Sequence, residues 1–355
     1  MKRVLFFGIF DPDYARSRVL CEGFEANGYT VEMCRVDPRA HRGVRKYLML
    51  FRQGRVRKKE HFEYIFVLFP GHTVVWLARL LFGKRIIFDA FVSLYNSNVH
   101  DRTRYVARSL PALRDRLFDW SSCALAGTVL VDTQAHRQYF IARHLASPKK
   151  TLVVPVGASQ AWFEAETAHA PQAKHKTITV GFYGTYIPLQ GIDSIVRAAA
   201  TLSRAPLRFE IIGSGQDTAR IAALIKELGG LPNVTFIPRI SRDELIERVR
   251  CFDINLGIFG TTEKAQRVVP NKVYEAAALG KAVITADTPA AREIFSEKEV
   301  ILVPSGDPSA LAKAIRSLAA DLAQRRLIAT AARELMVERY TPDKIVANLL
   351  KELPH

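Results

Sequence analysis

Residues 264–285, KAQRVVPNKVYEAAALGKAVIT, decide the fold of this chain, because they join a charged loop, a helix and a buried strand. The pattern predicts a helix with Pro270 at its first helical position, where the missing N–H costs nothing, and with Gly280 directly after its end. The β-branched run AVIT then predicts a short strand that is buried on both faces. A helix that leads into such a strand is typical of a parallel α/β sheet.

The start of this predicted helix carries the side chains of an anion site. Unpaired N–H groups and a partial positive charge attract anions to a helix N-terminus. Lys264, Arg267 and Lys272 surround that end, and Glu275 lies one turn further in, where its carboxylate can accept hydrogen bonds from two sugar hydroxyls. This combination predicts a nucleotide-sugar site. An ordinary buried αβ unit with a solvated charged loop would also fit these residues.

Length and composition narrow the class of protein. The 355 residues exceed the usual size of one domain, so two domains are expected, and 48% hydrophobic with 24% charged residues is typical of a globular protein. Four scattered cysteines without metal-ligand spacing favour a reduced intracellular compartment. The longest apolar stretch, residues 62–83, is interrupted by Pro70 and Gly71. We therefore expect a cytoplasmic protein without a transmembrane helix or a bound metal.

Positive charge is concentrated in the first half of the chain. Residues 1–150 hold 26 Lys and Arg against 13 Asp and Glu, whereas residues 151–355 hold 25 against 22. Residues 39–59 hold nine bases and no acid, with apolar residues interspersed in a way that fits one amphipathic helix. Such a helix predicts peripheral binding to an anionic membrane surface, on the inner face of the membrane. A solvated basic face and a nucleic-acid site are the alternatives, although no nucleic-acid-binding motif accompanies the stretch.

Apolar runs alternate with helical patterns through both halves of the chain, which is typical of parallel sheets covered by helices. Between the halves, residues 157–176 lose all periodicity and are interpreted as part of a linker. The predicted strands are 3–9, 30–36, 63–69, 85–88, 129–132 and 151–154, then 177–183, 208–212, 233–237, 252–257, 282–285 and 299–303. The predicted helices of the first half are 15–27, 43–54, 73–82, 102–126 and 134–145, and the last ones are 308–320, 322–338 and 342–353.

These patterns predict two doubly wound, Rossmann-like α/β domains that face a cleft. The predicted boundaries are an N-terminal domain (1–158), a linker (159–176), a C-terminal domain (177–338) and a final helical segment (339–355).

Two glycine-containing turns fall at the carboxyl ends of predicted strands, where ligands bind in such sheets. They are GFYGT (181–185) and IIGSGQ (211–216). Gly184, Gly213 and Gly215 are expected to let the backbone approach a ligand or a neighbouring segment closely. Neither turn has the GxGxxG spacing, which disfavours an NAD enzyme.

Five blocks give the C-terminal half a family resemblance. In order across residues 180–296 they are GFYGTYIPLQGIDSIVRAA, FEIIGSGQ, VTFIPRISRDEL, DINLGIF and PNKVYEAAALGKAVIT. As a set they resemble the donor domain of GT-B glycosyltransferases, in particular the retaining enzymes of glycosyltransferase family 4. The N-terminal half is compatible with the acceptor domain of that family. The end of the chain, ERYTPDKIVANLLKEL, resembles its closing helix, which crosses back to the N-terminal domain.

The resemblance implies roles for several residues. Glu275 matches the second acid of the family's E-x7-E motif and would bind the ribose, while Arg267 stands where the first acid is expected. Thr185 and Gln190 stand where the family places the arginine and lysine that clamp the diphosphate. We therefore expect Lys264 and Arg267 to stabilise the leaving diphosphate as catalytic residues. The expected donor-binding residues are Gly184, Thr185, Gly213, Gly215, Arg239, Asn271, Lys272 and Glu275.

In the N-terminal half, the loop after the first predicted strand occupies the position of the family's first loop, which covers the donor phosphates or the acceptor. Arg16 and Arg18 would reach an anionic group there, or pair with Asp11 and Asp13. Asp89 ends the fourth predicted strand and is expected to face the cleft as a catalytic residue.

The expected function is that of a hexosyltransferase in envelope or exopolysaccharide biosynthesis. Its expected partners are a nucleotide-sugar donor, a sugar or lipid-linked acceptor and an anionic membrane bound through residues 39–59, without nucleic acid. A sugar-nucleotide epimerase of the GT-B fold, or a GT-B binding protein with a degenerate, inactive donor site, are the alternatives. A few side chains set each specificity, so the nucleotide, the sugar and the acceptor stay open at this point, as does the oligomeric state.

Overall fold

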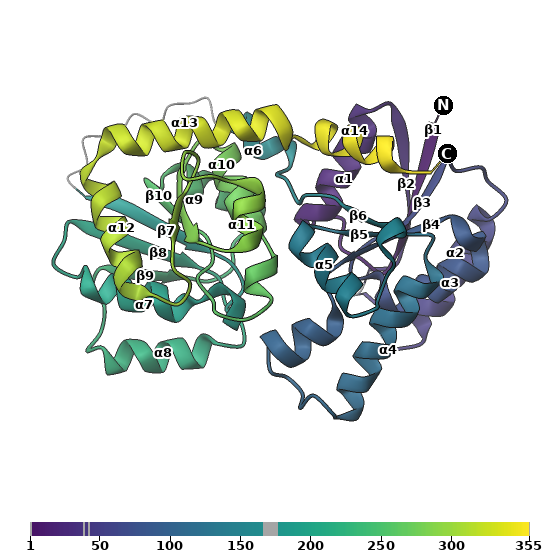
Figure 1. The fold of residues 1–355 in the computed structure, drawn as a ribbon, viewed down its shortest axis with the longest axis horizontal. Helices are drawn as coiled ribbons and strands as arrows, with labels where there is room; N and C mark the ends of the chain where they lie inside the picture. Colours follow the sequence, from purple (N-terminus) through teal and green to yellow (C-terminus); the bar gives the residue numbers. More distant parts are fainter. Residues whose placement is uncertain (1, 38–39, 42, 166–176, 355) are drawn as a thin grey trace. The chain divides into compact units, whose positions relative to one another are not determined.

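A computed structural model describes residues 2–37, 40–41, 43–165 and 177–354. The chain divides into two compact units, which are described separately here. Unit 1 comprises Met1–Ser159 and Thr341–His355, and unit 2 comprises Gln160–Tyr340. Each unit contains one six-stranded sheet in which every paired strand runs parallel to its neighbour (Figure 1). The predicted class, two doubly wound α/β domains, is confirmed.

The sheet of unit 1 has the strand order β2-β1-β3-β4-β5-β6. The chain adds β2 on one side of β1 and β3 on the other, so the helices that connect strands in the two directions cover opposite faces of the sheet. Phenylalanines from neighbouring strands and helices fill one side of this core, as in the edge-to-face contact of Phe6 with Phe24 and Phe66. The strands are β1 (Lys2–Gly8), β2 (Tyr29–Arg35), β3 (Tyr64–Val67), β4 (Ile86–Phe91), β5 (Thr128–Val131) and β6 (Thr151–Val153).

Most helices of unit 1 agree with the predicted ranges. The predicted helix at 102–126 is shorter in the structure, where a π-helix (Asn96–Asp101) and a loop precede α4. Pro111 explains where α4 begins, because proline is accepted in the first turn of a helix and not further inside. The helices are α1 (Ala15–Ala26), α2 (Arg45–Arg57), α3 (Val75–Phe82), α4 (Leu110–Leu125), α5 (Gln134–Ala142) and α14 (Pro342–Glu352).

Helix α14, the last of the chain, packs on α1 within unit 1. The contact depends on Gly23, because a Cβ there would overlap the Pro342 carbonyl oxygen and the Val346 side chain. The Asn27 side-chain amide donates a hydrogen bond of 2.9 Å to the Asp343 carbonyl oxygen.

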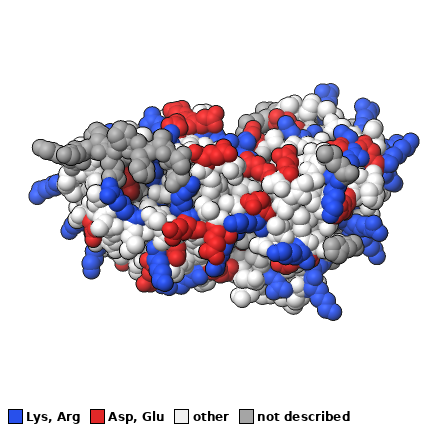
Figure 2. Space-filling model, turned by 90° about the horizontal axis from the view of Figure 1, so that it is seen from above, with Lys and Arg blue, Asp and Glu red and all other residues white. Residues whose placement is uncertain are grey.

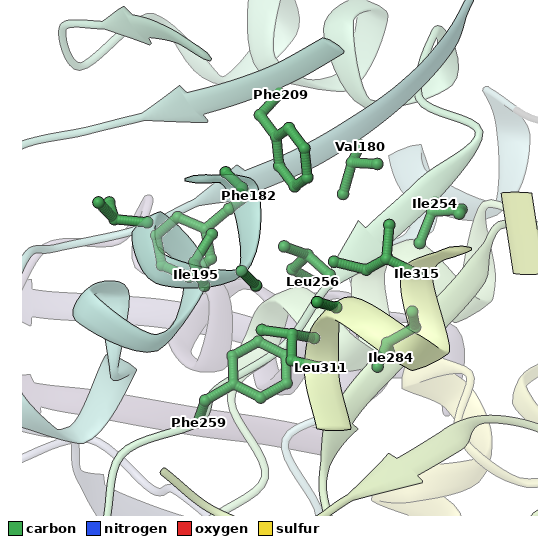
Figure 3. Close-up of a cluster of buried hydrophobic side chains, with 14 of the residues drawn as sticks. Val180, Phe182, Ile195, Phe209, Ile254, Leu256, Phe259, Ile284, Leu311 and Ile315 are labelled. Carbon is green, nitrogen blue, oxygen red and sulfur yellow. The ribbon is translucent and has the colours of Figure 1, made fainter. Parts of the chain in front are cut away.

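The sheet of unit 2 has the order β12-β11-β10-β7-β8-β9. Its largest hydrophobic cluster joins the inner strands to α7 and α12, as shown by Phe182, Phe209, Leu256 and Ile315 in Figure 3. The strands are β7 (Ile178–Tyr183), β8 (Leu207–Ile212), β9 (Val234–Ile237), β10 (Ile254–Leu256), β11 (Ala282–Ala286) and β12 (Ile301–Val303). The helices are α6 (Gln160–Glu164), α7 (Ile192–Thr201), α8 (Thr218–Glu227), α9 (Arg242–Arg250), α10 (Asn271–Ala278), α11 (Pro289–Ile294), α12 (Pro308–Ala320) and α13 (Leu322–Arg339).

The stretch predicted as a linker, residues 159–176, begins with a helix. Helix α6 forms there because Trp162 and Phe163 are buried in unit 2, an anchor that the loss of periodicity concealed. Residues 166–176 of the predicted linker lie outside the described residues. Within the described residues, no helix combines the length and the apolar content needed to span a membrane.

The decisive stretch forms the elements that its sequence predicts, with one shift. Pro270 has an extended backbone and is the N-cap residue of α10, so the first helical residue is Asn271. Gly280 has φ +68°, and its N–H donates to the Ala277 carbonyl oxygen. This left-handed conformation after the last turn favours glycine and ends the helix before β11.

We expect Gly23→Ala to lower the free energy of unfolding by about 1–3 kcal/mol, the usual cost of overpacking a tight contact. Urea unfolding of the full chain measures the change. Glu25→Ala, an exposed substitution on the same helix, is the matched control and should change the free energy by less than about 0.5 kcal/mol. Equal stability of the two variants would contradict a close contact between α1 and α14.

Candidate functional site

The strand order of unit 2 marks one place for a ligand. The chain builds the sheet outward from β7 through β8 to β9 and then returns to add β10 on the other side of β7. A crevice forms beyond the carboxyl ends of the two strands at which the order reverses, and ligands of open α/β sheets bind there. The segments that follow β7 and β10, together with the helices they enter, therefore form the candidate site.

The glycine turns at this edge pack tightly on each other. A Cβ at Gly213 would overlap the Gly184 carbonyl oxygen, and a Cβ at Gly215 would overlap the backbone of Tyr186. The Gly184 N–H donates a 2.9 Å hydrogen bond to Ile212, which ties the two turns together. Of the two roles that the sequence left open for Gly213 and Gly215, close approach to a neighbouring segment is therefore the one seen.

Lys272 occupies the space that Gly184 leaves. A Cβ on Gly184 would lie 2.7 Å from the Lys272 Nζ and would displace the amine from its present position. Nζ donates a hydrogen bond to the Gln190 side-chain oxygen and lies 3.7 Å from the centroid of the Phe182 ring. Burial holds the pKa of Lys272 well below the ordinary lysine value, because water is excluded from the charged form. An anion placed beside Nζ would favour its protonation again.

Glu275 lies on the same helix and is also buried; its residue is 8% exposed and Lys272 is 6% exposed. The Tyr183 hydroxyl donates a 2.8 Å hydrogen bond to the Glu275 Oε2. Burial raises the pKa of the Glu275 carboxyl to about 7, and the hydrogen bond from Tyr183 and the nearby Lys272 oppose this shift. The site thus holds an amine and a carboxyl whose charged forms are both disfavoured without a ligand.

Sequence reasoning missed two aromatic residues of this arrangement. Tyr183 ends β7, and its ring is stacked on that of Trp162, with 6.2 Å between the ring centroids and 10° between the planes. Tyr183 stands directly before Gly184, so its place at the strand end was available as a signal. Trp162 had no such signal, because it falls in the stretch interpreted as a linker.

Lys264 and Arg267, the two cationic residues of unit 2 that are predicted to be catalytic, lie in the turn before α10. A 3₁₀ turn spans Ala265–Arg267, and Ala265 belongs to a buried cluster with Leu189, on the loop that carries Gln190. This cluster brings the turn with Lys264 and Arg267 next to the loop after β7. Lys264 is buried, and the Arg267 Nη2 lies 3.4 Å from the Glu263 carboxylate, an exposed partner.

The remaining residues predicted to bind the donor lie at different positions along the sheet relative to Lys272 and Glu275. Asn271 is the half-buried first residue of α10, and Thr185 is exposed directly after Gly184. Arg239 is exposed and follows β9, the edge strand, two strands away from β7. The structure therefore groups Gly184, Thr185, Asn271, Lys272 and Glu275 and leaves Arg239 apart.

In unit 1 the structure corrects the expected position of Asp89. Asp89 and Arg16 are each only 1% exposed and form a buried ion pair, with 2.8 Å between the Arg16 Nε and the Asp89 Oδ1. Arg16 also donates to the Val154 carbonyl oxygen at 2.9 Å. Burial raises the pKa of Asp89 and the Arg16 charge opposes this. Asp89 does not face solvent, and Arg16 is used inside the unit.

Arg18 follows the alternative that the sequence left open for it. Its guanidinium, on α1, pairs with Asp13, an exposed acid of the loop before that helix.

The family model described as "Glycosyl transferases group 1" matches residues 164–352, more than half of the chain. D-inositol 3-phosphate glycosyltransferase of Kineococcus radiotolerans is 29% identical over 221 residues, which are 56% of this chain and 51% of that protein. The chain thus spans about half the length of this curated relative.

Two solved structures resemble the whole chain. Sucrose-phosphate synthase from Thermosynechococcus elongatus gives a TM-score of 0.74 at 18% identity, covering 99% of this chain and 98% of that one. Anabaena HepE in complex with UDP-glucose gives 0.74 at 16% identity, covering 99% and 100%. These identities establish similarity of fold.

The fold and the family match together define a glycosyltransferase-type protein of two Rossmann-like units. The chain belongs to the glycosyl transferases group 1 family. This confirms the resemblance that the five sequence blocks carry.

The buried carboxyl of Glu275 predicts a pH dependence of stability. In the unfolded chain this group loses its proton near the ordinary pKa of 4.5, whereas in the folded chain it keeps the proton up to about 7. The folded state binds more protons between these values, so this group makes the free energy of unfolding fall as pH rises. We expect Glu275→Gln to gain about 1–3 kcal/mol relative to wild type between about pH 5 and about pH 8.

Urea unfolding of both proteins across this range measures the effect. Glu227→Gln, which changes an exposed carboxyl of α8, should alter the free energy of unfolding by less than about 0.5 kcal/mol. A pH-independent difference for Glu275→Gln would show that burial does not shift its pKa.

Proposed function

We propose that this chain transfers a hexose-type sugar from a nucleotide diphosphate donor to an acceptor hydroxyl, in the synthesis of an envelope or exopolysaccharide precursor. The observation that carries the proposal is the buried group of Lys272, Gln190, Tyr183 and Glu275 at the edge of the sheet where the strand order reverses. A buried amine and a buried carboxyl whose pKa values are both shifted toward the neutral form fit a ligand that has a diphosphate at one end and ribose hydroxyls at the other.

The donor would bind through α10. The first N–H groups of this helix and the Lys272 amine would hold the diphosphate, and the Glu275 carboxylate would accept hydrogen bonds from the ribose. Pro270 supports this assignment, because an N-cap proline offers no side-chain group to cap these N–H groups. The N-cap residue of α7 also lacks a side-chain group for capping, because it is Gly191, with φ +64°.

In this proposal, Lys272 supplies the positive charge that an arginine and a lysine supply to the diphosphate in the family. The family resemblance implies a lysine at position 190, where this chain has glutamine, and the structure brings the Lys272 Nζ onto that glutamine. The positive charge would then reach the diphosphate from α10. Lys264 and Arg267 would add charge from the neighbouring turn.

The reaction would proceed with retention of configuration, as the family resemblance implies. The bond between the anomeric carbon and the leaving phosphate oxygen breaks, and a bond to the acceptor oxygen forms on the same face. The acceptor proton passes to the leaving phosphate. Negative charge grows on the diphosphate during this step, so cations that strengthen their contact there accelerate it. The nucleotide-sugar is a substrate, and the proposal needs no further cofactor.

One structural neighbour and one relative guide the choice of ligands. HepE was solved in complex with UDP-glucose, and the Kineococcus relative is named D-inositol 3-phosphate glycosyltransferase. We propose a UDP-hexose as the first donor to test and a hydroxyl of a sugar or lipid-linked precursor as the acceptor.

We further propose that the protein acts on the cytoplasmic side of a membrane. Lys and Arg side chains stand out along the right-hand edge of Figure 2, at the end of unit 1, which supports contact with an anionic surface. The sequence assigned this contact to residues 39–59. In the described part of that stretch, Arg57 pairs with Glu32 and Glu60, which removes some of its charge.

Donor binding tests the proposed function directly. We expect a UDP-hexose at about 100 times its Kd to stabilise the wild type by about 2.7 kcal/mol, because it binds only the folded state. Thermal unfolding with UDP, GDP, ADP and TDP sugars measures this. Glu275→Ala should weaken nucleotide binding by about 1–3 kcal/mol, the value of a charge-assisted hydrogen bond.

Glu227→Ala, which removes an exposed carboxylate of α8, is the control and should bind like the wild type. No stabilisation by any nucleotide sugar would overturn the proposal. Binding without transfer to any acceptor would leave the inactive binding protein, and inversion of the bound sugar at one hydroxyl would identify the epimerase.

The cations should affect turnover more than donor affinity, because the leaving group gains charge in the transition state. We expect Lys272→Met to lower turnover by about 10²-fold or more. Lys264→Ala and Arg267→Ala, singly and together, test the additional charge. Steady-state turnover and donor affinity by calorimetry separate the two effects. Lys313→Ala, an exposed lysine of α12, is the control; full turnover of Lys272→Met would assign the diphosphate to other residues.

A further inference from the structure

Helix α4 of unit 1 exposes large apolar residues and buries several polar ones. Its buried side combines the small residues Ala112 and Cys123 with Asp115, Asp119 and Ser122. The Asp119 carboxylate accepts hydrogen bonds of 2.6 Å from the Ser93 hydroxyl and 2.8 Å from the Leu94 N–H, so the helix is attached through polar contacts. A soluble helix normally has the opposite pattern.

The outward side of α4 carries a regular apolar stripe. Leu110, Leu113, Leu117 and Trp120 are 83%, 50%, 57% and 54% exposed. Their spacing of three, four and three residues puts them on one face of the helix. This stripe is not covered by any described part of unit 1.

Helix α3, which packs beside α4, adds to this surface. Trp76 and Leu80, one turn apart on α3, are also exposed large apolar residues. We call the six residues Trp76, Leu80, Leu110, Leu113, Leu117 and Trp120 the α3–α4 face. Exposed apolar surface of this size normally marks an interaction site.

The segment that carries the α3–α4 face, residues 64–131, exposes charge of a single sign. Between residues 64 and 131, all described, the four acids Asp89, Asp101, Asp115 and Asp119 are at most 2% exposed. The eight bases of the same range are all at least partly exposed. They are Arg79, Lys84, Arg85, Arg102, Arg104, Arg108, Arg114 and Arg116. The surface of this region therefore presents positive charge without exposed carboxylates.

We propose that the α3–α4 face binds the surface of an anionic lipid bilayer and is the membrane contact of this protein. Leucines enter the boundary between headgroups and acyl chains, the two tryptophans lie at headgroup depth, and the arginines contact lipid phosphates. The proposal deepens the membrane location given under the proposed function and moves the contact away from residues 39–59. It does not depend on glycosyl transfer.

Charge argues against a second copy of the chain as the occupant. A two-fold dimer would place the same face of both copies together, and this face carries bases without exposed acids. The resulting repulsion between like charges opposes such a dimer. Tryptophan on both helices favours lipid over an acidic protein, because indole rings concentrate at membrane interfaces.

Helix α2 is less suited to be the main contact. Leu48 and the N-cap residue Val44 lie on one face, and Val56 follows two turns later, so this helix presents fewer large apolar residues than the α3–α4 face and no tryptophan. Two basic side chains of α2 lie near aromatic rings of the same helix. The Lys46 Nζ is 5.2 Å from the centroid of the Tyr47 ring, and the Arg55 guanidinium is 5.8 Å from the centroid of the Phe51 ring.

Vesicle binding of the full chain tests the proposal, without donor or acceptor. The probes are vesicles of phosphatidylcholine alone and of phosphatidylcholine with phosphatidylglycerol, measured by co-sedimentation at low and high salt. We expect at least tenfold stronger binding to the anionic vesicles, weakening as salt increases. The combined variant Leu113→Gln, Leu117→Gln and Trp120→Gln should lose at least tenfold in binding. The three substituted side chains are exposed, so the variant is expected to fold like the wild type, and urea unfolding checks this.

Two control variants locate the contact. Leu322→Gln, Leu327→Gln and Val337→Gln together change three exposed apolar residues of α13 in unit 2 and should bind like the wild type. Arg45→Gln, Arg52→Gln and Arg55→Gln on α2 should lose less than about threefold.

Three results would overturn the proposal. The first is full vesicle binding by the α4 variant, and the second is an equal loss in the α13 variant. The third is a wild-type protein that forms a dimer in sedimentation velocity and does not bind vesicles, together with an α4 variant that is a monomer. A protein that binds vesicles as expected but transfers no sugar would overturn only the proposed function.

Discussion

The burial of Lys272 and Glu275 in the first two turns of α10 is the constraint on which the candidate site depends. Burying a charge costs several kcal/mol unless a partner compensates for the lost water. Neighbouring side chains offset part of this cost, because Gln190 accepts a hydrogen bond from Lys272 and Tyr183 donates one to Glu275. The pKa shifts of both residues run toward their neutral forms. A ligand with a diphosphate and hydroxyls would supply the partners that the charged forms lack.

This constraint also explains the glycines around the site. A Cβ on Gly184 would displace the Lys272 amine, and a Cβ on Gly213 would overlap the Gly184 carbonyl oxygen. The edge of the sheet is therefore crowded before any ligand binds. A site of this kind is held in position by backbone packing, which is how a rigid scaffold orients polar groups for catalysis.

The two units use buried charge differently. In unit 1 the Arg16 guanidinium closes on Asp89 and on the Val154 carbonyl oxygen, so its charge is satisfied inside the protein. In unit 2 the Lys272 amine has a neutral amide as its partner. A complete ion pair stabilises the packing of strands and loops, whereas an amine facing an amide retains the capacity to bind an anion. The difference supports placing the nucleotide in unit 2.

The sequence by itself determined the alternation of strands and helices and the division into two α/β units, and it predicted a concentration of function around α10. The alternation and the division depend on local periodicity and on helix-start and helix-stop residues, which act over a few positions, whereas a role of α10 in donor binding stays a prediction. Only the tertiary structure decided that Lys272 meets Gln190, 82 residues away, that Arg16 meets Asp89, 73 residues away, and that Trp162 covers Tyr183. It also decided that α4 turns its leucines outward, because polar partners from residues 93–98 hold its other side. Periodicity shows that an element has two faces, and the order of strands in the sheet decides what each face meets.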